Sequence, residues 1–298
     1  MTEGQTGFGA STTRILPVVH RISSSDLFDA LHFGFGDFEA MPSHAIFLCV
    51  IYPLVGIFLV SIVSGNSMLQ LAFPIAAGFA LVGPFAAVGL YELSRRREAG
   101  LDTSPSHAFG VLRSPSLGAI ASLGLLLMAI FLLWLALAQA VYVANFGYAA
   151  PKSIPQFIST VFSTSEGWRM IIVGTLIGFL FAVVVLTISV VSFPLLLDRV
   201  VGVPVALLTS IHVVALNPWT TALWGLIVAI LLTIGSMPFF LGLPVVMPVL
   251  GHATWHLYRR AVDASAQPRA EPRPIEKPYR SAADFPAALF PAIHRKSR

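Results

Sequence analysis

Two histidines one helical turn apart form the most chemically suggestive pattern in the sequence. His252 and His256 stand at positions i and i+4 of an apolar segment, so a helix places both imidazoles on one face. That spacing suits two nitrogen ligands on one metal ion. The alternative is that the rings anchor the helix at the membrane surface, as aromatic side chains often do. Trp255 and Tyr258, which flank His256, favour the alternative.

Carboxylates at the ends of two other apolar segments extend this candidate site. Two imidazoles and the Glu92 carboxylate, gathered from different helices, could bind iron, zinc or manganese, which makes these three residues speculative metal ligands. Glu92 and Asp198 both have arginines nearby and could instead simply pair with them. The candidate polar cluster comprises Tyr91, Glu92, Asp198, Arg199, His252 and His256.

Other kinds of chemistry find less support. A six-coordinate haem needs ligands on opposing faces, and the other histidines near apolar segments, His44 and His212, lie at segment ends. Ion-driven pumps need ionisable residues inside the membrane, and the centres of the apolar segments contain none. The sequence shows no phosphate-binding loop or nucleophile elbow, and the single Cys49 excludes a cysteine-based metal cluster. We therefore expect no enzymatic activity and no cofactor.

The composition shows what kind of element must position these residues. The chain has 298 residues, of which 56% are hydrophobic and 11% are charged, whereas soluble domains carry about 25% charged residues. No Asp, Glu, Lys or Arg occurs from Val200 to Thr254. A helix crosses a membrane with roughly 20 apolar residues. Lipid must therefore be the solvent for much of this chain.

The apolar segments predict an all-α, polytopic membrane bundle with six transmembrane helices. The predicted spans are residues 44–64, 68–93, 117–143, 169–197, 219–235 and 238–258. The first and last pairs are joined by tight turns, and the middle pair by a longer link. Within this link, the apolar residues of 157–162 predict one amphipathic turn on the membrane surface.

A pattern that occurs three times divides the six spans into hairpins. An amphipathic stretch runs into an Xaa-Pro step, and two apolar segments follow. The residue before a proline is disfavoured in helical geometry, so each stretch should be a separate helix in the cytoplasmic membrane interface, here called an elbow helix. The steps are Met41-Pro42, Ser114-Pro115 and Asn217-Pro218, and the units are residues 24–93, 104–197 and 203–258.

Each elbow helix has start signals and an apolar stripe. Ser23–Asp26 caps the first, Ser104-Pro105 begins the second, and Pro204 begins the third. In the first, Asp29 and Asp37 fall outside the stripe. The stripes are Leu27, Leu31, Phe35 and Phe38; Ala108, Val111 and Leu112; and Leu207, Ile211, Val214 and Ala215.

The second helix of each hairpin carries a proline in its cytoplasmic half: Pro84, Pro194 and Pro248. Proline removes a backbone hydrogen bond and kinks a helix, which a neighbouring helix or a wet cavity can compensate. Three kinks at one depth could splay the bundle and open a cleft toward the cytoplasm. Alternatively, they only help the helices to pack.

The basic residues predict the orientation. Of the 18 Lys and Arg residues, all but Lys152 and Arg169 fall on one side of the six spans. By the positive-inside rule, this places both termini in the cytoplasm of a bacterial inner membrane. The basic residues thus mark a membrane face and do not indicate nucleic-acid binding. We expect residues 1–23 and the Pro-rich basic tail, residues 259–298, to be disordered.

Several stretches resemble a known family. They are Leu71–Pro74 with Gly78–Pro84, Val88–Arg96, Ser189–Arg199, the Asn217-Pro218 step and Leu250–Arg259. Together they resemble a proteobacterial integral membrane family of unknown function, domain of unknown function 2189, over roughly residues 20–260. Members often carry the label cytochrome c oxidase subunit I. A haem-copper oxidase core needs more histidine ligands than the four near the predicted spans, so the chain cannot be that catalytic subunit.

The sequence thus favours a non-enzymatic accessory, assembly or scaffold role, beside a respiratory complex if the label reflects its surroundings. Its partners would be the lipid bilayer and other membrane proteins. One alternative is a small-molecule or lipid transporter with a cytoplasm-facing cleft between the kinked helices. A second alternative is a metal- or haem-binding membrane protein that uses His252 and His256.

Overall fold

The computed structural model describes residues 16–41, 69–75, 83–85, 87–149, 151, 153–237 and 241–271, and these are nearly all helical. The first predicted span, 44–64, lies outside the described residues, as do Pro42, His44 and Cys49. The second predicted span is described in part, by η1 (Leu69–Leu71), by short helical stretches, and by the first turns of α4 (Val88–Glu98).

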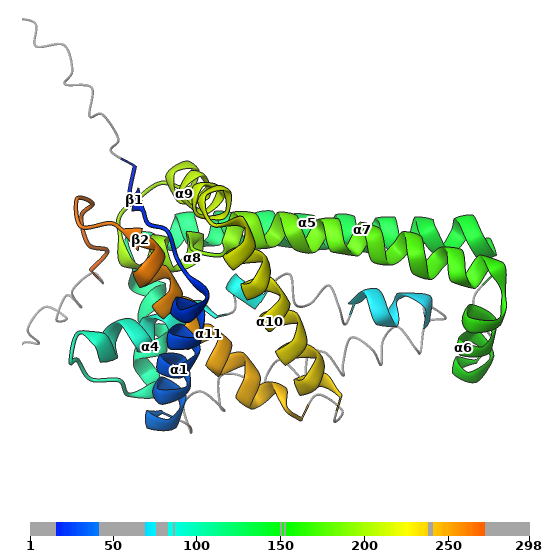
Figure 1. Cartoon of the computed structure of the whole chain (residues 1–298), viewed down its shortest axis with the longest axis horizontal. Helices are drawn as coiled ribbons and strands as arrows, with labels where there is room; N and C mark the ends of the chain where they lie inside the picture. The colour runs from blue at the N-terminus through cyan, green and yellow to red at the C-terminus, as the bar shows by residue number, and fades with distance from the viewer. Residues whose placement is uncertain are drawn as a thin grey trace, which may run out of the picture.

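A long helical hairpin dominates the molecule. The helices α5 (Leu117–Phe146) and α7 (Ser165–Ser189) run side by side, and α6 (Ile154–Ser163) crosses their far end (Figure 1). These helices confirm the third and fourth predicted apolar segments and the helical turn predicted between them. Gly178 lets the two long helices approach closely, because a Cβ there would lie 3.1 Å from the Trp134 ring.

The chain then changes direction twice, each time next to a proline. Helix α7 ends at Ser189, and α8 (Ser192–Asp198) begins after a short turn. The turn contains Val190, four residues before Pro194, whose carbonyl cannot receive a hydrogen bond from a proline nitrogen. Helix α9 (Val203–Leu216) ends at Asn217, whose backbone is not helical, and α10 (Pro218–Ser236) begins directly at the proline. The predicted break at Asn217-Pro218 is confirmed, and the kink predicted at Pro194 lies just after the turn between α7 and α8.

By length and composition, three stretches of the described chain could cross a membrane: Leu117–Phe146, Ser165–Asp198 and Pro218–Ser236. The last helix, α11 (Leu243–Ala261), covers most of the sixth predicted span but is not among them. Its second half carries both histidines and two arginines, and it is packed inside the polar end of the molecule. Pro248 lies within α11 and does not interrupt it.

The first elbow helix, α1 (Ser24–Ala40), packs along α11. It begins with the predicted cap, in which Ser23 and Asp26 bond to each other's backbone N–H groups. Its buried face differs from the predicted stripe, because it consists of Leu27, Ala30, Gly34 and Asp37. Phe35 is exposed, and the placement of Asp37 off the packed face was wrong. Gly34 makes this packing possible, since a Cβ there would lie 2.5 Å from the Ala253 nitrogen.

The other two elbow segments also form helices, with differences in detail. The second, η2 (Pro105–Arg113), is a 3-10 helix that packs on α4 through Ala108 and leaves Leu112 exposed. The third, α9, buries its small and polar side and leaves Leu208 and Ile211 exposed. An apolar stripe directed away from the protein is what a helix lying on lipid requires.

The two ends of the chain meet in a short ribbon at the polar end. β1 (Val18–Val19) pairs antiparallel with β2 (Val262–Asp263), and residues up to 271 continue across the end of α8. Asn217 holds the segment that follows β1. Its Oδ1 accepts a hydrogen bond from the Ile22 N–H at 2.8 Å, and its Nδ2 donates to the His20 carbonyl. Residues 16–23 and 259–271, predicted to be disordered, are therefore ordered; residues 272–298 lie outside the described part.

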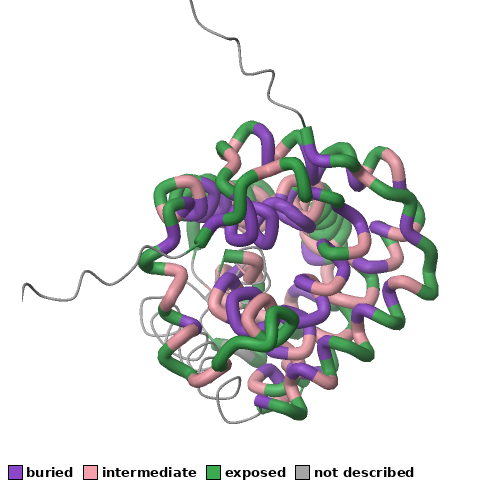
Figure 2. The backbone as a smooth tube through the Cα atoms, turned by 90° about the vertical axis from the view of Figure 1, so that its left-hand side faces the viewer, coloured by how far each residue is buried: buried purple, intermediate pink, exposed green. Residues whose placement is uncertain are grey.

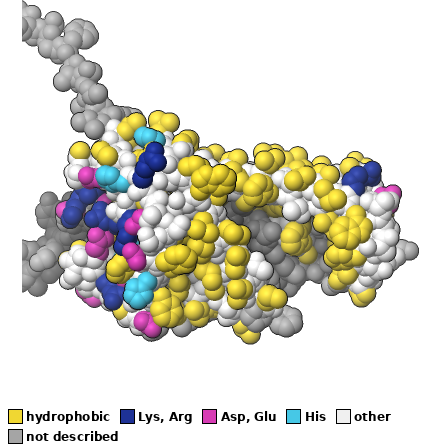
Figure 3. Space-filling model, viewed as in Figure 1, with side chains coloured by type: hydrophobic (Ala, Val, Ile, Leu, Met, Phe, Trp, Pro, Cys, Tyr) yellow, Lys and Arg dark blue, Asp and Glu magenta, His cyan; other side chains and the backbone are white. Residues whose placement is uncertain are grey.

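The charged side chains gather at one end of the structure. Figure 3 shows arginines, acids and histidines crowded at the end where α1, α4 and α11 meet, and mainly apolar side chains along the remaining length, with a small charged group at the opposite end. A view onto that end shows buried and exposed residues alternating along the helices, which is typical of helices with one packed face (Figure 2). Beyond this end, Glu166 and Arg169 are the charged residues of the described hairpin.

Candidate functional site

The two histidines of the candidate site face one carboxylate, Asp37 of α1. Asp37 Oδ2 accepts a hydrogen bond from His256 Nε2 at 2.9 Å and from Ser94 Oγ at 2.6 Å. Its other oxygen accepts from the Arg97 guanidinium at 2.7 Å. His252 Nδ1 lies 2.7 Å from Ser94 Oγ. We call these five residues the Asp37 cluster; it joins α1, α4 and α11.

The hydrogen bonds of this cluster determine the tautomer of His252. Ser94 has one hydroxyl proton, which it donates to Asp37, so it must accept a proton from His252 Nδ1. His252 Nε2 then carries a lone pair. That atom is buried and makes no hydrogen bond within the described part of the chain. In this cluster the negative charge of Asp37 is paired with the positive charge of Arg97. The hydroxyl of Ser94 orients the His252 ring.

Asp37 remains ionised in this environment. Burial raises the pKa of the Asp37 carboxyl, but hydrogen bonds from His256 and Ser94 outweigh burial, so its pKa lies below the ordinary 3.8. A buried carboxylate with three donors, one of them an arginine, is satisfied in its ionised form. This explains how a charged residue can occupy the packed face of α1.

A second cluster ties α8 and α4 to α11. Asp198 Oδ2 accepts from Tyr258 Oη at 2.9 Å and from its neighbour Arg199 at 3.0 Å. Glu98 accepts from Trp255 Nε1 at 2.9 Å and from Arg259 Nε at 3.0 Å. Arg259 also approaches Asp198 at 3.8 Å and so joins the two acids. These six residues are called the Asp198 cluster.

Arginines of both α4 and α8 extend this network to the C-terminal segment. Arg199 donates to the Gln267 carbonyl at 2.9 Å, and Arg95 donates to the Ala270 carbonyl at 3.1 Å. The Ala270 N–H donates in turn to the Asp198 carbonyl. The segment after β2 is thus held to the body of the protein by groups that the sequence shows only as isolated charges.

The remaining predicted residues belong to neither cluster. Glu92 is buried and pairs with Arg95 at 2.7 Å and with Arg96 at 3.7 Å, and Tyr91 is buried in the core. Glu92 is therefore engaged by arginines, the alternative that its sequence surroundings left open. Within the described ranges, no three His, Cys, Asp or Glu side chains are grouped so that they could hold a metal ion.

All six predicted residues lie at the polar end, but in three separate groups. The sequence interpretation missed Asp37, Ser94, Arg97, Glu98, Trp255, Tyr258 and Arg259. A signal for Asp37 was present, because Leu27, Ala30, Gly34 and Asp37 follow each other at helical spacing. The side chains of both clusters donate to and accept from one another. Such an arrangement fixes helices in place.

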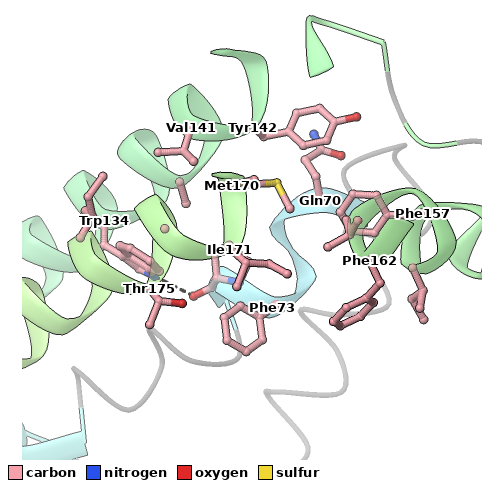
Figure 4. A pocket seen from close by; sticks show the side chains of 16 residues that line it. Gln70, Phe73, Trp134, Val141, Tyr142, Phe157, Phe162, Met170, Ile171 and Thr175 are labelled. Atoms are coloured by element: carbon pink, nitrogen blue, oxygen red, sulfur yellow. Dashed lines mark hydrogen bonds between the residues drawn. The ribbon is translucent and has the colours of Figure 1, made fainter. Parts of the chain in front are cut away.

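The hollow in the described structure lies elsewhere, at the far end of the long hairpin. A pocket of about 480 Å³ is enclosed by α5, α6, α7 and the segment that begins with η1. Trp134 and Tyr142 line it from α5, and Phe157 and Phe162 line it from α6 (Figure 4). Its volume falls in the range of about 300 to 1,000 Å³ that is typical of ligand sites.

The walls of this pocket are almost entirely apolar. The polar groups of Trp134 and Tyr142 are occupied, since Trp134 Nε1 donates to the Pro74 carbonyl at 2.9 Å and Tyr142 Oη donates to the Ala149 carbonyl at 2.6 Å. Gly174 contributes an open wall, because no described atom lies within 4 Å of the position of a Cβ there. No acid, imidazole or thiol is among the residues that line the pocket.

A helical chain with three membrane-length apolar helices and its charges gathered at one end is an integral membrane protein. Residues 72–198, from the segment beside the pocket to the end of α8, match the model of a family described as predicted integral membrane protein (DUF2189). This match confirms the resemblance drawn from the sequence motifs. No curated protein and no solved structure matches the chain.

Proposed function

We propose that the protein binds a membrane lipid without chemically altering it, by enclosing one lipid chain in the pocket between α5, α6 and α7. The observation that carries the proposal is the apolar lining of this pocket within the part of the molecule that faces lipid. The absence of acids, imidazoles and thiols from its walls favours binding over catalysis. The sequence favoured an accessory or scaffold role; the pocket moves our preference to lipid handling.

We further propose six spans with both termini in the cytoplasm of a bacterial inner membrane. Met41 packs with Leu93 at the polar end, whereas Trp134 bonds to Pro74 in the far half of the hairpin. These two contacts support a chain that passes from the polar end to the far half and back between residues 41 and 93. Two crossings there, added to α5, α7–α8, α10 and α11, make six, and the arginines of the polar end support its cytoplasmic position.

In this orientation the pocket lies toward the side of the membrane opposite the cytoplasm. The predicted transporter instead had a cleft that opened to the cytoplasm between kinked helices. At that end, the described helices α1, α4, α8 and α11 are joined by the Asp37 and Asp198 clusters. The proposal thus keeps lipid as the ligand but places its binding site near the opposite surface.

Filling the pocket tests the proposal. Gly174→Phe would project a ring into the open wall, while Gly118→Phe makes the same change on α5, away from the pocket and also free of described neighbours within 4 Å. The probe is phosphatidylcholine with brominated chains, added to protein in mild detergent, and the readout is quenching of Trp134 fluorescence. The Trp134 signal is the difference between wild type and Trp134→Phe.

We expect saturable quenching in wild type and in Gly118→Phe, and at least about a tenfold loss of affinity in Gly174→Phe, which corresponds to about 1.4 kcal/mol. Thermal unfolding should show that both phenylalanine variants remain folded. Quenching that rises linearly without saturation, or that is unchanged in a folded Gly174→Phe protein, would contradict a lipid site in this pocket.

A further inference from the structure

An arginine and a glutamate that form no ion pair with each other lie near the end of the hairpin beyond the residues that line the pocket. Arg169 Nε donates to Asn145 Oδ1 across the hairpin at 2.6 Å, and Asn145 Nδ2 is fixed by the Val141 carbonyl at 2.7 Å. Glu166 accepts from Ser165 Oγ at 2.9 Å. No ion pair within 4.0 Å joins Glu166 and Arg169, although residues at i and i+3 of a helix are neighbours.

The position of this pair relative to the pocket follows from helical spacing. Asn145 is one turn beyond Val141, and Arg169 precedes Met170 and Ile171; Val141, Met170 and Ile171 all line the pocket. From Trp134 to Tyr142 the pocket follows α5 for eight residues, or about 12 Å. The charged pair therefore stands at the outer end of an elongated apolar site.

Exposed aromatic residues place the same end at the level of lipid head groups. Tyr148 is 92% exposed and Trp168 is 51% exposed, and both lie where α5 ends and α7 begins. Exposed tyrosine and tryptophan at helix ends are typical of the interface between lipid and water. A ligand with its chain near Trp134 would thus present its polar head beside Glu166 and Arg169.

The free groups of the pair match opposite charges on one head group. Arg169 donates its Nε–H to Asn145. Its two terminal nitrogens make no hydrogen bond within the described residues. They could therefore donate two hydrogen bonds to one phosphate. Because Asn145 draws the guanidinium toward α5, Arg169 forms no direct ion pair with Glu166. The Glu166 carboxylate is then available to accept hydrogen bonds from an ammonium group one helical turn away.

We infer that the pocket is a site for a zwitterionic phospholipid with a primary ammonium group, of the phosphatidylethanolamine class. Its phosphate binds Arg169, its ammonium group donates to Glu166, and one acyl chain fills the pocket toward Trp134. The inference rests on the proposed lipid-binding function and adds the head group to it. An anionic lipid would satisfy Arg169 and be repelled by Glu166, and a quaternary ammonium could not donate hydrogen bonds to the carboxylate.

Head-group selectivity tests the inference with three lipids that carry identical brominated chains: phosphatidylethanolamine, phosphatidylcholine and phosphatidylglycerol. Trp134 quenching in wild-type protein should show the tightest binding for phosphatidylethanolamine, by about threefold or more. Arg169→Gln should weaken all three by about tenfold, since charge-assisted hydrogen bonds contribute roughly 1.5 to 3 kcal/mol. Glu166→Gln should reduce the advantage over both other lipids, because the neutral amide neither attracts an ammonium group as a carboxylate does nor repels phosphatidylglycerol. Arg113→Gln, at the polar end, should change nothing.

The outcomes separate the head group from the pocket. Equal binding of the three lipids, or preference for phosphatidylglycerol, would overturn the head-group assignment and leave the lipid pocket standing. Selectivity that persists in Glu166→Gln would equally overturn the role of that carboxylate. Failure of all three lipids to give saturable quenching in wild type would overturn the proposed function itself.

Discussion

The polar end and the far end of the hairpin are built in opposite ways. At the polar end, side chains from α1, α4, α8 and α11 donate to and accept from one another, and each acid is engaged by several partners. At the far end, the contacts are mainly apolar with a few isolated hydrogen bonds, a pocket remains between the helices, and the one arginine described there is only partly engaged. The comparison teaches that the charged residues of this chain serve mainly to join helices, whereas the room for a ligand lies where charges are sparse.

Removing the Asp37 carboxylate should have the largest effect on stability. Asp37→Ala leaves Ser94 and His256 without their acceptor and Arg97 without its partner, and breaking a buried pair in this way costs roughly 3 to 5 kcal/mol. We expect about 3 kcal/mol, because Arg97 is partly exposed and can regain water. Thermal unfolding in detergent measures the change.

The matched control is Asp29→Ala on the same helix. Asp29 is 54% exposed and pairs only with Arg260 at 3.0 Å, so its loss should cost less than about 1 kcal/mol. Equal destabilisation by the two substitutions would mean that burial of Asp37 does not distinguish it, and the contrast between the two ends would lose its main support.

A smaller effect is expected from closing the gap between α1 and α11. Gly34→Ala places a methyl group against the Ala253 backbone, which cannot move as a flexible side chain could, and should destabilise the protein by roughly 1 to 3 kcal/mol. Gly36→Ala meets no described atom within 4 Å and should instead stabilise α1 by up to about 1 kcal/mol through helix propensity. A stabilising Gly34→Ala would show that the two helices are less closely packed than described.

Acid should weaken the polar end, with the smallest effect of the three. Hydrogen bonds from His256 and Ser94 hold the pKa of Asp37 below 3.8 despite its burial. A depressed pKa contributes stability that is complete above the unfolded value and is lost as pH falls through the folded one. The melting temperature of the wild-type protein should therefore decrease as the pH is lowered beneath about 4. The decrease should be less steep in Asp37→Asn than in the wild type. Parallel pH profiles for the two proteins would assign the acid sensitivity to other carboxylates.

The long apolar helices could be predicted from the sequence, because a run of apolar residues of this length forms a helix in lipid whatever its tertiary contacts. The helices α5 and α10, and α7 together with α8, begin and end within a few residues of the predicted bounds. The kink at Pro194 and the break at Pro218 follow from the chemistry of proline. These features depend on residues close together in the chain, so their signal is local.

The polar end could be predicted only in part, because its contacts join distant segments. Asp37 was placed outside the apolar stripe of the first elbow helix, and its burial depends on donors from the distant helices α4 and α11. Asn217 was recognised because a proline follows it. Its hydrogen bonds to Ile22 and His20 join residues 195 and 197 positions apart in the sequence, which no local pattern indicates. The pocket depends on how α6 meets α5 and α7, which helical periodicity does not encode.

The packing of α1 on α11 also has a consequence for how the protein is made. Gly34 leaves the ribosome early, but its partner Ala253 belongs to the last helix, and synthesis at roughly 5 to 20 residues per second separates them by tens of seconds. During that time the spans can enter the membrane while α1 waits with Asp37 uncovered. The polar end can therefore assemble only after α11 has been synthesised. A chain truncated before Leu243 should leave α1 accessible to added protease.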